Sequence, residues 1–166
     1  FAASPFTEGK PNGFQSWRGD IWRDTDNRRA GVPTFLFNNT FGYKDYADWA
    51  LDVPMYFVLR QGHYHDATHV TFRQFMNGAL KASVPDGVPN MGDWTNHLGS
   101  LFPDVRLKRF LEMRGADGGP WRRITALPAF WVGLLYDEDA LAAAEALTAD
   151  WRYDDVMHMR GTVPVM

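Results

Sequence analysis

The chain has 166 residues, 45% of them hydrophobic and 15% aromatic, which is enough apolar material for one compact domain with a real core. A formal net charge of −3 gives no strongly basic surface, so we expect no nucleic-acid partner. The absence of cysteine excludes disulfides and thiolate chemistry, and we expect a cytoplasmic protein. No apolar run nears the roughly 20 residues that span a bilayer, so we expect no membrane partner.

Glycine, proline and capping signals predict the elements of the first half of the chain. A helix at 44–51 is expected to end before Pro54, since the residue before a proline disfavours helix. In chain order the predictions are an ordered loop over 1–13, a short helix over 16–24, an extended piece over 34–37, a helix over 44–51, strands over 55–59 and 64–67 paired around a turn at 60–63, and a helix capped by Thr71 that runs to about Leu80.

The second half is predicted to alternate between helices and one long strand. The longest apolar run, 126–136, is interpreted as part of a buried helix that opens at Pro120, an allowed first-turn position. The full set is a loop over 82–90, a helix over 93–102, a strand over 104–114, the apolar helix after Pro120 and an amphipathic helix over 138–148. Hairpins mixed with helices, without a βαβ rhythm, predict an α+β domain with an antiparallel sheet.

The predicted strand 104–114 has one charged side. Strand side chains alternate between faces, and the apolar side is predicted to hold Val105, Leu107, Leu111 and Met113, interrupted by Arg109. The other side is predicted to hold Arg106, Lys108, Phe110, Glu112 and Arg114. The strand runs into the turn 115–119, whose glycines would let backbone N–H groups approach an anion.

Two interpretations of this charged side remain open. It is the solvated face of an antiparallel sheet, or it is the floor of a ligand cleft. In the second case Glu112 and Arg114 would lie roughly 6–7 Å apart along the strand. That separation is the one needed to hold Mg²⁺ on one part of a triphosphate and a guanidinium on another.

Five stretches of this sequence resemble glutamate–cysteine ligase of the plant and proteobacterial type. They are 4–13 (SPFTEGKPNG), 50–58 (ALDVPMYFV), 111–123 (LEMRGADGGPWRR), 127–136 (LPAFWVGLLY) and 148–151 (TADW). They occur in the family's order over essentially the whole chain, which resembles the middle-to-later part of the family's length. We therefore expect residues 1–166 to be a single segment of a larger catalytic domain, with upstream and downstream parts missing.

The resemblance implies a function and a fold. The family uses ATP and Mg²⁺ to join glutamate and cysteine into γ-glutamylcysteine through a γ-glutamyl phosphate, the first step of glutathione biosynthesis. Its fold is similar to the catalytic part of glutamine synthetase. We therefore expect an α+β chain with part of a curved antiparallel sheet, flanking helices, and a polar sheet face that forms the active site.

The resemblance also implies roles for particular residues. Glu112 would help bind Mg²⁺, and Arg114 would contact the transferred phosphoryl group, so these two are the expected catalytic residues. Arg18 would grip glutamate, and Tyr56 would line the amino-acid pocket. The remaining candidates are Trp121, Arg122 and Arg123 for substrate, and Lys10 and Asp117, with Arg114, for the nucleotide.

The chain also departs from the family pattern, and alternatives stay open. Plant members carry regulatory cysteines at positions that align with Ala67, Ala82 and Thr125, so that thiol switch cannot operate here. Further carboxylate ligands and much of the nucleotide site are expected in the missing remainder of the enzyme, which leaves the isolated chain inactive. The alternatives are a carboxylate–amine ligase with another amine acceptor, a zinc hydrolase built on His63, His65 and His69, and a catalytically incompetent anion-binding or structural segment.

Overall fold

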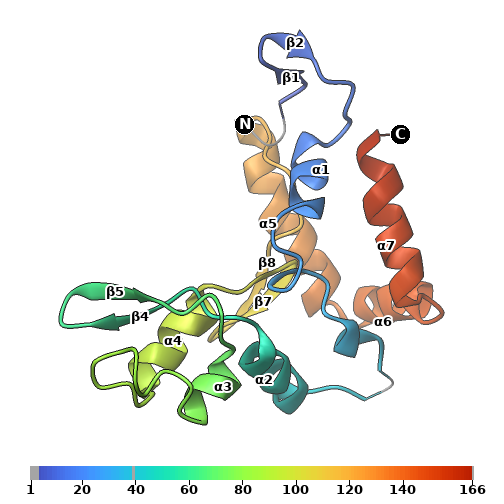
Figure 1. Cartoon of the computed structure of the whole chain (residues 1–166). Coiled ribbons are helices and arrows are strands. Elements are labelled where there is room, and N and C mark those ends of the chain that lie inside the picture. Colours follow the sequence, from blue (N-terminus) through green and yellow to red (C-terminus); the bar gives the residue numbers. More distant parts are fainter. Residues whose placement is uncertain (1–3, 39, 166) are drawn as a thin grey trace. The chain divides into compact units, whose positions relative to one another are not determined.

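The computed structural model describes residues 4–38 and 40–165, which form helices joined by short strands. The chain divides into two compact units: unit 1 is Phe1–Asp24 with Ala116–Met166, and unit 2 is Thr25–Gly115. Figure 1 labels the elements of both. The predicted α+β class is confirmed, because helices and strands alternate along the chain without a repeated βαβ unit.

Unit 2 contains the longer of the paired strands and a small apolar core. Its elements are β3 (Ala30–Gly31), the 3₁₀ helix η1 (Thr34–Phe37), α2 (Tyr43–Asp52), β4 (Phe57–Arg60), β5 (His63–Asp66), α3 (Phe72–Met76), α4 (Met91–Gly99), β6 (Phe102–Pro103), β7 (Val105–Leu107) and β8 (Leu111–Met113).

Aromatic side chains of α3 and α4 organise this core. Phe72 packs edge-on against Phe75 and Trp94, with ring centroids 5.8 and 4.9 Å apart. The main cluster consists of Met55, Val58, Ala67, Val70, Phe72, Phe75, Leu80 and Val84. A second cluster, of Ala50, Val53 and Leu101, shares Trp94 with the first. Burial of these side chains holds the short helices of unit 2 together; each Val, Leu, Phe or Met contributes about 1.5–3 kcal/mol when fully removed from water.

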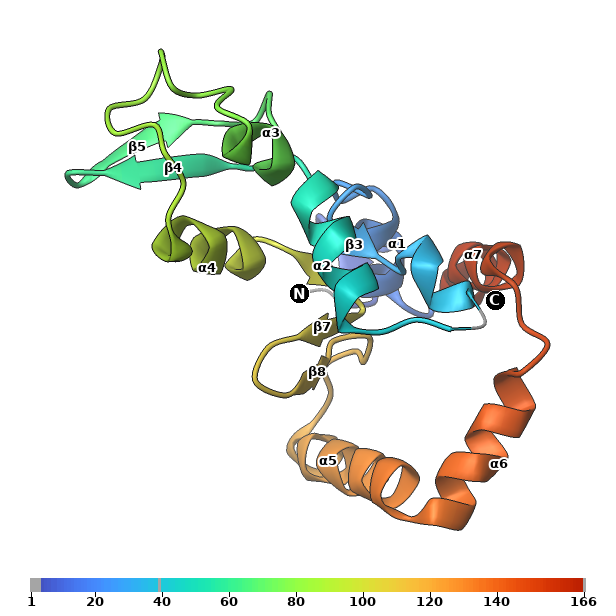
Figure 2. The ribbon, with the colours of Figure 1, turned by 90° about the horizontal axis from the view of Figure 1, so that it is seen from below.

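Two local predictions in unit 2 are confirmed by its hydrogen bonds. The Gln74 N–H donates to the Thr71 hydroxyl at 3.2 Å, and the Thr71 N–H donates to the Gln74 side-chain oxygen at 2.8 Å. This reciprocal cap begins α3 at the predicted residue, although the helix ends at Met76. Strands β4 and β5 pair as predicted, and Gln61 and Gly62 both have positive φ, which suits a two-residue hairpin turn. Figure 2 shows this hairpin beside α3 and α4.

The predicted curved antiparallel sheet is not present in the described residues. Their strands form four separate two-stranded sheets, and one of these, β3 with β6, is parallel. The predicted extended piece at 34–37 is also wrong, because these residues form η1. The Asn38 N–H closes η1 on the Phe35 carbonyl at 3.1 Å, while the Phe35 ring packs against Tyr46 and Trp49. Tertiary packing has overridden the β propensity of this short aromatic stretch.

Unit 1 is built mainly from helices. It contains β1 (Phe6–Thr7), β2 (Lys10–Pro11), α1 (Trp17–Arg23), α5 (Trp121–Tyr136), α6 (Glu138–Thr148), α7 (Tyr153–Thr162) and the 3₁₀ helix η2 (Val163–Val165). A loop was predicted over the first thirteen residues, of which 1–3 lie outside the described residues. Residues 6–11 form a short hairpin instead, in which Glu8 and Gly9 adopt the positive φ of a tight turn. The predicted helix at 16–24 is confirmed as α1, whose Ser16 hydroxyl accepts the Gly19 N–H at 3.0 Å.

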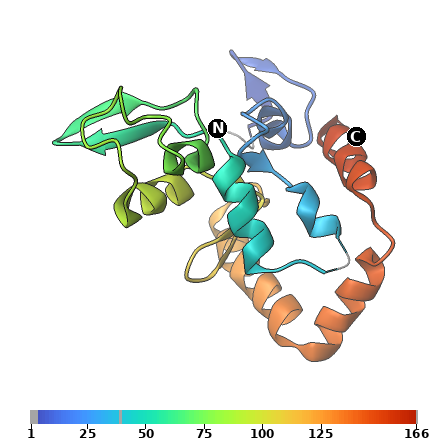
Figure 3. The ribbon, with the colours of Figure 1, turned by 60° about the horizontal axis from the view of Figure 1, so that its bottom comes forward.

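Helix α5 forms where the apolar run predicted a helix, but it is not buried. No residue of α5 falls in the buried class, and Phe130 is 59% exposed. Figure 3 shows α5 and α6, which meet at Asp137. Within residues 4–38 and 40–165, no helix has the length and apolar character that crossing a bilayer requires.

Candidate functional site

The charged segment of unit 2 folds into a hairpin. Strands β7 and β8 pair antiparallel around Lys108–Phe110, where a single strand over 104–114 was predicted. The Lys108 N–H donates to the Phe110 carbonyl at 2.9 Å and closes the turn. The prediction was wrong because the turn contains none of the Gly, Pro, Asn, Asp or Ser residues that usually signal one. The predicted separation of faces survives, since Arg106 pairs with Glu112 and Leu107 pairs with Leu111.

On the charged face, two arginines hold the Glu112 carboxylate. Arg106 Nε donates to Glu112 Oε2 at 2.6 Å, and Arg114 Nη1 donates to Oε1 at 3.2 Å. Both guanidiniums also lie beside the Phe102 ring, 5.8 and 5.5 Å from its centroid. Glu112 and Arg114 are thus in direct contact, closer than the predicted spacing along one strand.

The arginines set the charge of this site. The hydrogen bond from Arg106 holds the pKa of Glu112 below its usual value, and the positive charges of Arg106, Arg114 and Lys108 add to that effect. The Glu112 side chain keeps 30% of its surface exposed, and that of Arg114 keeps 21%. An ionised carboxylate and a guanidinium are therefore accessible side by side, as the cleft interpretation of this face requires.

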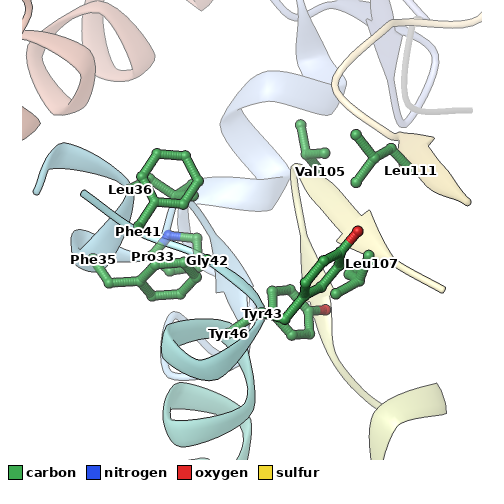
Figure 4. Close-up of a pocket in the computed structure, with 10 residues that line it drawn as sticks. All are labelled: Pro33, Phe35, Leu36, Phe41, Gly42, Tyr43, Tyr46, Val105, Leu107 and Leu111. Carbon is green, nitrogen blue, oxygen red and sulfur yellow. The ribbon is translucent and has the colours of Figure 1, made fainter. Parts of the chain in front are cut away.

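The opposite face of the hairpin lines an apolar pocket. Figure 4 shows the Tyr43 and Tyr46 rings of α2 near Leu107 of the hairpin, and the side chains from η1 and the following loop on the opposite side. The pocket has a volume of about 400 Å³ and is lined by Pro33, Phe35, Leu36, Phe41, Gly42, Tyr43, Tyr46, Val105, Leu107 and Leu111. None of these carries a charge, so the pocket does not suit a charged amino acid or a triphosphate. The charged face is the better candidate.

Tyr56, the third predicted site residue of unit 2, is held by a buried arginine. The Arg29 guanidinium carbon lies 3.7 Å from the centroid of the Tyr56 ring, a cation–π contact. Arg29 is 2% exposed and donates to Asp26 Oδ2 and the Pro54 carbonyl, each at 2.8 Å. Its Nη1 also lies 3.4 Å from the carbonyl and hydroxyl oxygens of Ser100. Tyr56 itself remains 38% exposed, so one part of it is available to a ligand.

The other predicted site residues belong to unit 1. Arg18 lies on α1 with its guanidinium carbon 5.6 Å from the Trp22 ring centroid. Lys10 is exposed on β2, and Asp117 is exposed in the segment before α5. Trp121, Arg122 and Arg123 form the exposed first turn of α5. The structure therefore brings Glu112 and Arg114 together within unit 2 and places these other candidates, apart from Tyr56, in unit 1.

Two metals, Mg²⁺ and zinc, can be compared with the side chains that could bind them. Mg²⁺ in nucleotide sites is commonly held by one or two carboxylates together with phosphate oxygens and water. Glu112 fits the role of one such ligand, because its carboxylate is ionised and partly exposed. Its hydrogen bond from Arg114 is also long, at 3.2 Å. Across the described ranges, no three or more His, Asp or Glu side chains converge as a metal site would need. The zinc alternative built on His63, His65 and His69 therefore has no support in the described structure.

Two contacts of the candidate site residues were missed by sequence reasoning. Arg106 was placed on the charged face without a role, yet it makes the shortest bond to Glu112. The sequence does contain a signal for this contact. Arg106 and Glu112 carry opposite charges and lie three residues before and three residues after Arg109, but they face each other only if 108–110 is a turn. Arg29 has no comparable signal, because its contact with Tyr56 joins positions 27 residues apart through the fold.

The structure defines an α+β chain with an ionised carboxylate beside an arginine, and the sequence comparison assigns its family. The model of glutamate-cysteine ligase family 2 (GCS2) matches residues 1–164. The chain therefore belongs to this family, which confirms the resemblance predicted from the five stretches.

Particular relatives are similar over almost the whole chain. A glutamate–cysteine ligase of Brassica juncea and one of Arabidopsis thaliana are each 59% identical over 165 residues, and one of Oryza sativa subsp. indica is 57% identical. These matches cover 99% of this chain but only 32%, 31% and 33% of the relatives. The chain thus spans about a third of the length of the curated relatives it matches.

The comparison also corrects one prediction. The relatives from all these plants are named chloroplastic enzymes, which contradicts the expected cytoplasmic location. The expectation rested on the lack of cysteine and of long apolar runs. Neither property distinguishes one reducing, aqueous compartment from another.

Proposed function

We propose that this chain is a segment of an ATP-dependent ligase that forms γ-glutamylcysteine from glutamate and cysteine, the first step of glutathione biosynthesis. The observation that carries the proposal is the 59% identity to enzymes named glutamate–cysteine ligase, which covers 99% of the chain. The small-molecule substrates are glutamate, cysteine and ATP. The charged hairpin face would belong to a curved, glutamine-synthetase-like sheet, since an isolated two-stranded hairpin is marginal by itself.

The proposed chemistry needs a site that tolerates concentrated negative charge. A carboxylate resists attack by an amine, so ATP first phosphorylates the γ-carboxylate of glutamate; the cysteine amine then displaces phosphate from the acyl phosphate. Mg²⁺, when bound, lowers the repulsion between phosphoryl oxygens and the incoming carboxylate. Glu112 would supply one carboxylate ligand to it. Arg114 would donate charge-assisted hydrogen bonds to the transferred phosphoryl group as charge develops there.

Other residues would bind and orient the substrates. Tyr56, fixed by Arg29, would form a wall of the amino-acid pocket. Arg18 would pair with a glutamate carboxylate. The basic first turn of α5, Trp121–Arg123, would contact substrate, and its helix terminus favours anions. Lys10 and Asp117, both exposed, would approach the nucleotide.

A chimera tests the proposal. This chain replaces the matching third of the Arabidopsis thaliana enzyme, and ADP release is measured with glutamate and cysteine together and with each omitted. We expect release only with both, and hydroxylamine should trap the acyl phosphate as a hydroxamate. A folded chimera that releases no ADP would overturn the proposal. Equal rates with alanine or serine in place of cysteine would favour the alternative, a related ligase with another amine acceptor.

The 166-residue chain by itself is the second half of this experiment. We expect it to be inactive, because further ligands of the metal and nucleotide would come from the remainder of the enzyme. Calorimetry with ATP and glutamate, with and without that remainder, would separate a segment that binds substrate from one that serves only as part of the sheet.

A further inference from the structure

Arg106 is buried between the hairpin and the end of helix α4. Only 8% of the residue is exposed. Its Nε donates to Glu112 Oε2 at 2.6 Å, while its Nη1 lies 3.1 Å from the Leu101 carbonyl oxygen and 3.3 Å from that of Gly99. One side chain thus connects the carboxylate of the candidate site to the backbone of another element.

The anchor on the backbone is a favourable place for a guanidinium. The last carbonyls of an α-helix have no partner within the helix, and the partial negative charge of a helix C-terminus attracts cations. Helix α4 ends at Gly99, so the carbonyls that hold Arg106 are those of its last residue and of the two-residue exit that follows. Backbone atoms cannot rotate away as a long side chain can. The anchor therefore fixes the guanidinium in one orientation.

A fixed guanidinium makes the two oxygens of Glu112 unequal. Oε2 receives the short bond from Arg106, whereas Oε1 receives the longer bond from the more exposed Arg114. We propose that Arg106 is a positioning residue: it locks the Glu112 carboxylate so that Oε1, beside Arg114, is the oxygen presented to magnesium. This inference rests on the proposed function, because it assigns a support to the proposed metal ligand.

A purely structural role for Arg106 would give a different result. If Arg106 serves only to cap α4 and join the hairpin, its replacement lowers stability without changing the dependence of activity on Mg²⁺. If it positions Glu112, replacement weakens the metal site itself. Partners that orient metal ligands typically contribute about 10- to 100-fold in metal affinity or activity.

The test is a double-mutant cycle in the chimera, with Arg106→Lys, Glu112→Gln and the double variant. Mg²⁺ binding is measured by calorimetry in the presence of glutamate and a non-hydrolysable ATP analogue, and activity is titrated with Mg²⁺ at saturating ATP, glutamate and cysteine; the two readings should shift together. Lysine keeps the charge but loses the bidentate geometry of the guanidinium. We expect Arg106→Lys to raise the Mg²⁺ concentration for half-maximal activity by about 10- to 100-fold and to recover rate at high Mg²⁺. In the Glu112→Gln background the same replacement should add little, since the group it positions is gone.

Arg60 offers a matched control. It too is a nearly buried arginine that binds a carboxylate, Asp93, at 2.6 Å and donates to backbone carbonyls, in this case those of Leu59, Asp86 and Val88. Arg60→Lys should lower thermal stability without shifting the Mg²⁺ titration. An equal shift in both lysine variants would overturn the positioning role.

A second variant covers the case in which Arg106→Lys does not fold. Glu112→Asp keeps the carboxylate at a partly exposed position but shortens the side chain, so the bond to Arg106 is lost. We expect this variant to raise the Mg²⁺ requirement about as much as Glu112→Gln does; a titration like that of the parent chimera would overturn the proposal. If Glu112→Gln has the same Mg²⁺ requirement as the parent chimera, Glu112 is not a metal ligand, and this inference fails with that role. If Glu112→Gln raises the Mg²⁺ requirement but Arg106→Lys raises it equally in both backgrounds, only the positioning role of Arg106 is overturned.

Discussion

Asp26 offers the sharpest test of the forces that hold unit 2 together. Its carboxylate accepts hydrogen bonds from Arg28 Nε at 2.9 Å and from Arg29 Nε at 2.8 Å. The Arg28 bond, followed by the Arg29 bond and both positive charges, lowers the pKa of Asp26 from 3.8 to about 2 despite partial burial. Asp26→Asn removes the charge with little change of shape. Asparagine also tolerates the positive φ of 25° found at this position.

The size and sign of the effect follow from the pKa. Because the folded-state pKa lies below the ordinary value, the carboxylate stabilises the fold above about pH 4, and this stability is lost as the pH falls through the folded pKa of about 2. One pKa unit corresponds to about 1.4 kcal/mol, so the lowering of the Asp26 pKa from 3.8 to about 2 is worth about 2–3 kcal/mol. We expect Asp26→Asn to lose about that much at pH 7 and little at pH 2.

The assay has to be local, because the chain contains two compact units. The Phe102 N–H donates to the Arg29 carbonyl and the Asp104 N–H to the Gly31 carbonyl, both at 2.8 Å. Exchange of these two amides with deuterium, corrected for intrinsic rates, reports opening of the β3–β6 pair. We expect Asp26→Asn to speed their exchange at neutral pH.

An exposed carboxylate serves as the control, and the pH profile decides the outcome. Asp86→Asn changes an exposed residue that also has positive φ, and it should change exchange at Phe102 much less. A difference between Asp26→Asn and the parent chain that is the same at pH 2 and pH 7 would refute the electrostatic reasoning. No difference at either pH would show that the buried Arg29 is sustained by its carbonyl and ring contacts alone.

Three further predictions concern the chimeric ligase. Arg114→Ala should lower kcat by about 10²–10³ with an unchanged circular dichroism spectrum, and normal turnover in the folded variant would remove its phosphoryl role. Glu112→Gln should raise the Mg²⁺ requirement in a titration of activity, and a curve identical to the parent would count against metal binding. Arg18→Ala should raise the KM for glutamate in steady-state kinetics. A change confined to the KM for ATP would show that Arg18 does not belong to the glutamate site.

Elements specified by nearby residues were the ones predicted well. The reciprocal cap at Thr71 joins residues three positions apart, and the β4–β5 turn depends on Gly62 and its neighbour. Helix α6 is capped at its N-terminus by Asp137, whose side chain accepts the Ala140 N–H at 2.9 Å. In each case the decisive contact joins residues close in sequence, so the pattern alone was sufficient.

Elements specified by distant contacts were missed. Helix α7 has a charged, weakly patterned sequence, and the segment after it is held by the Gln15 N–H, which donates to the Pro164 carbonyl at 2.8 Å. The β3–β6 pair joins segments some 70 residues apart, and its two residues per strand give no periodic signal. The turn at 108–110 is stabilised by pairing of Arg106 with Glu112 across it rather than by its own residues.

In the candidate site, too, some residues were found from the sequence and others only from the fold. Resemblance supplied Glu112, Arg114 and Tyr56, but not the arginines that hold them. Arg106 and Arg29 occur far apart in the sequence, yet both bind oxygen atoms of the short exit from α4: Arg106 those of Gly99 and Leu101, Arg29 those of Ser100.

This shared anchor has a consequence for the proposed mechanism. The proposed metal ligand Glu112 and the proposed pocket residue Tyr56 each rest on a buried guanidinium, and both guanidiniums rest on the end of one helix. A displacement of that helix end would move both supports together, so phosphoryl chemistry and amino-acid binding would be lost together. A change in either arginine alone would affect one of them. In the proposed site, the end of α4 would therefore fix the spacing between Glu112 and Tyr56, which are 56 residues apart in the sequence.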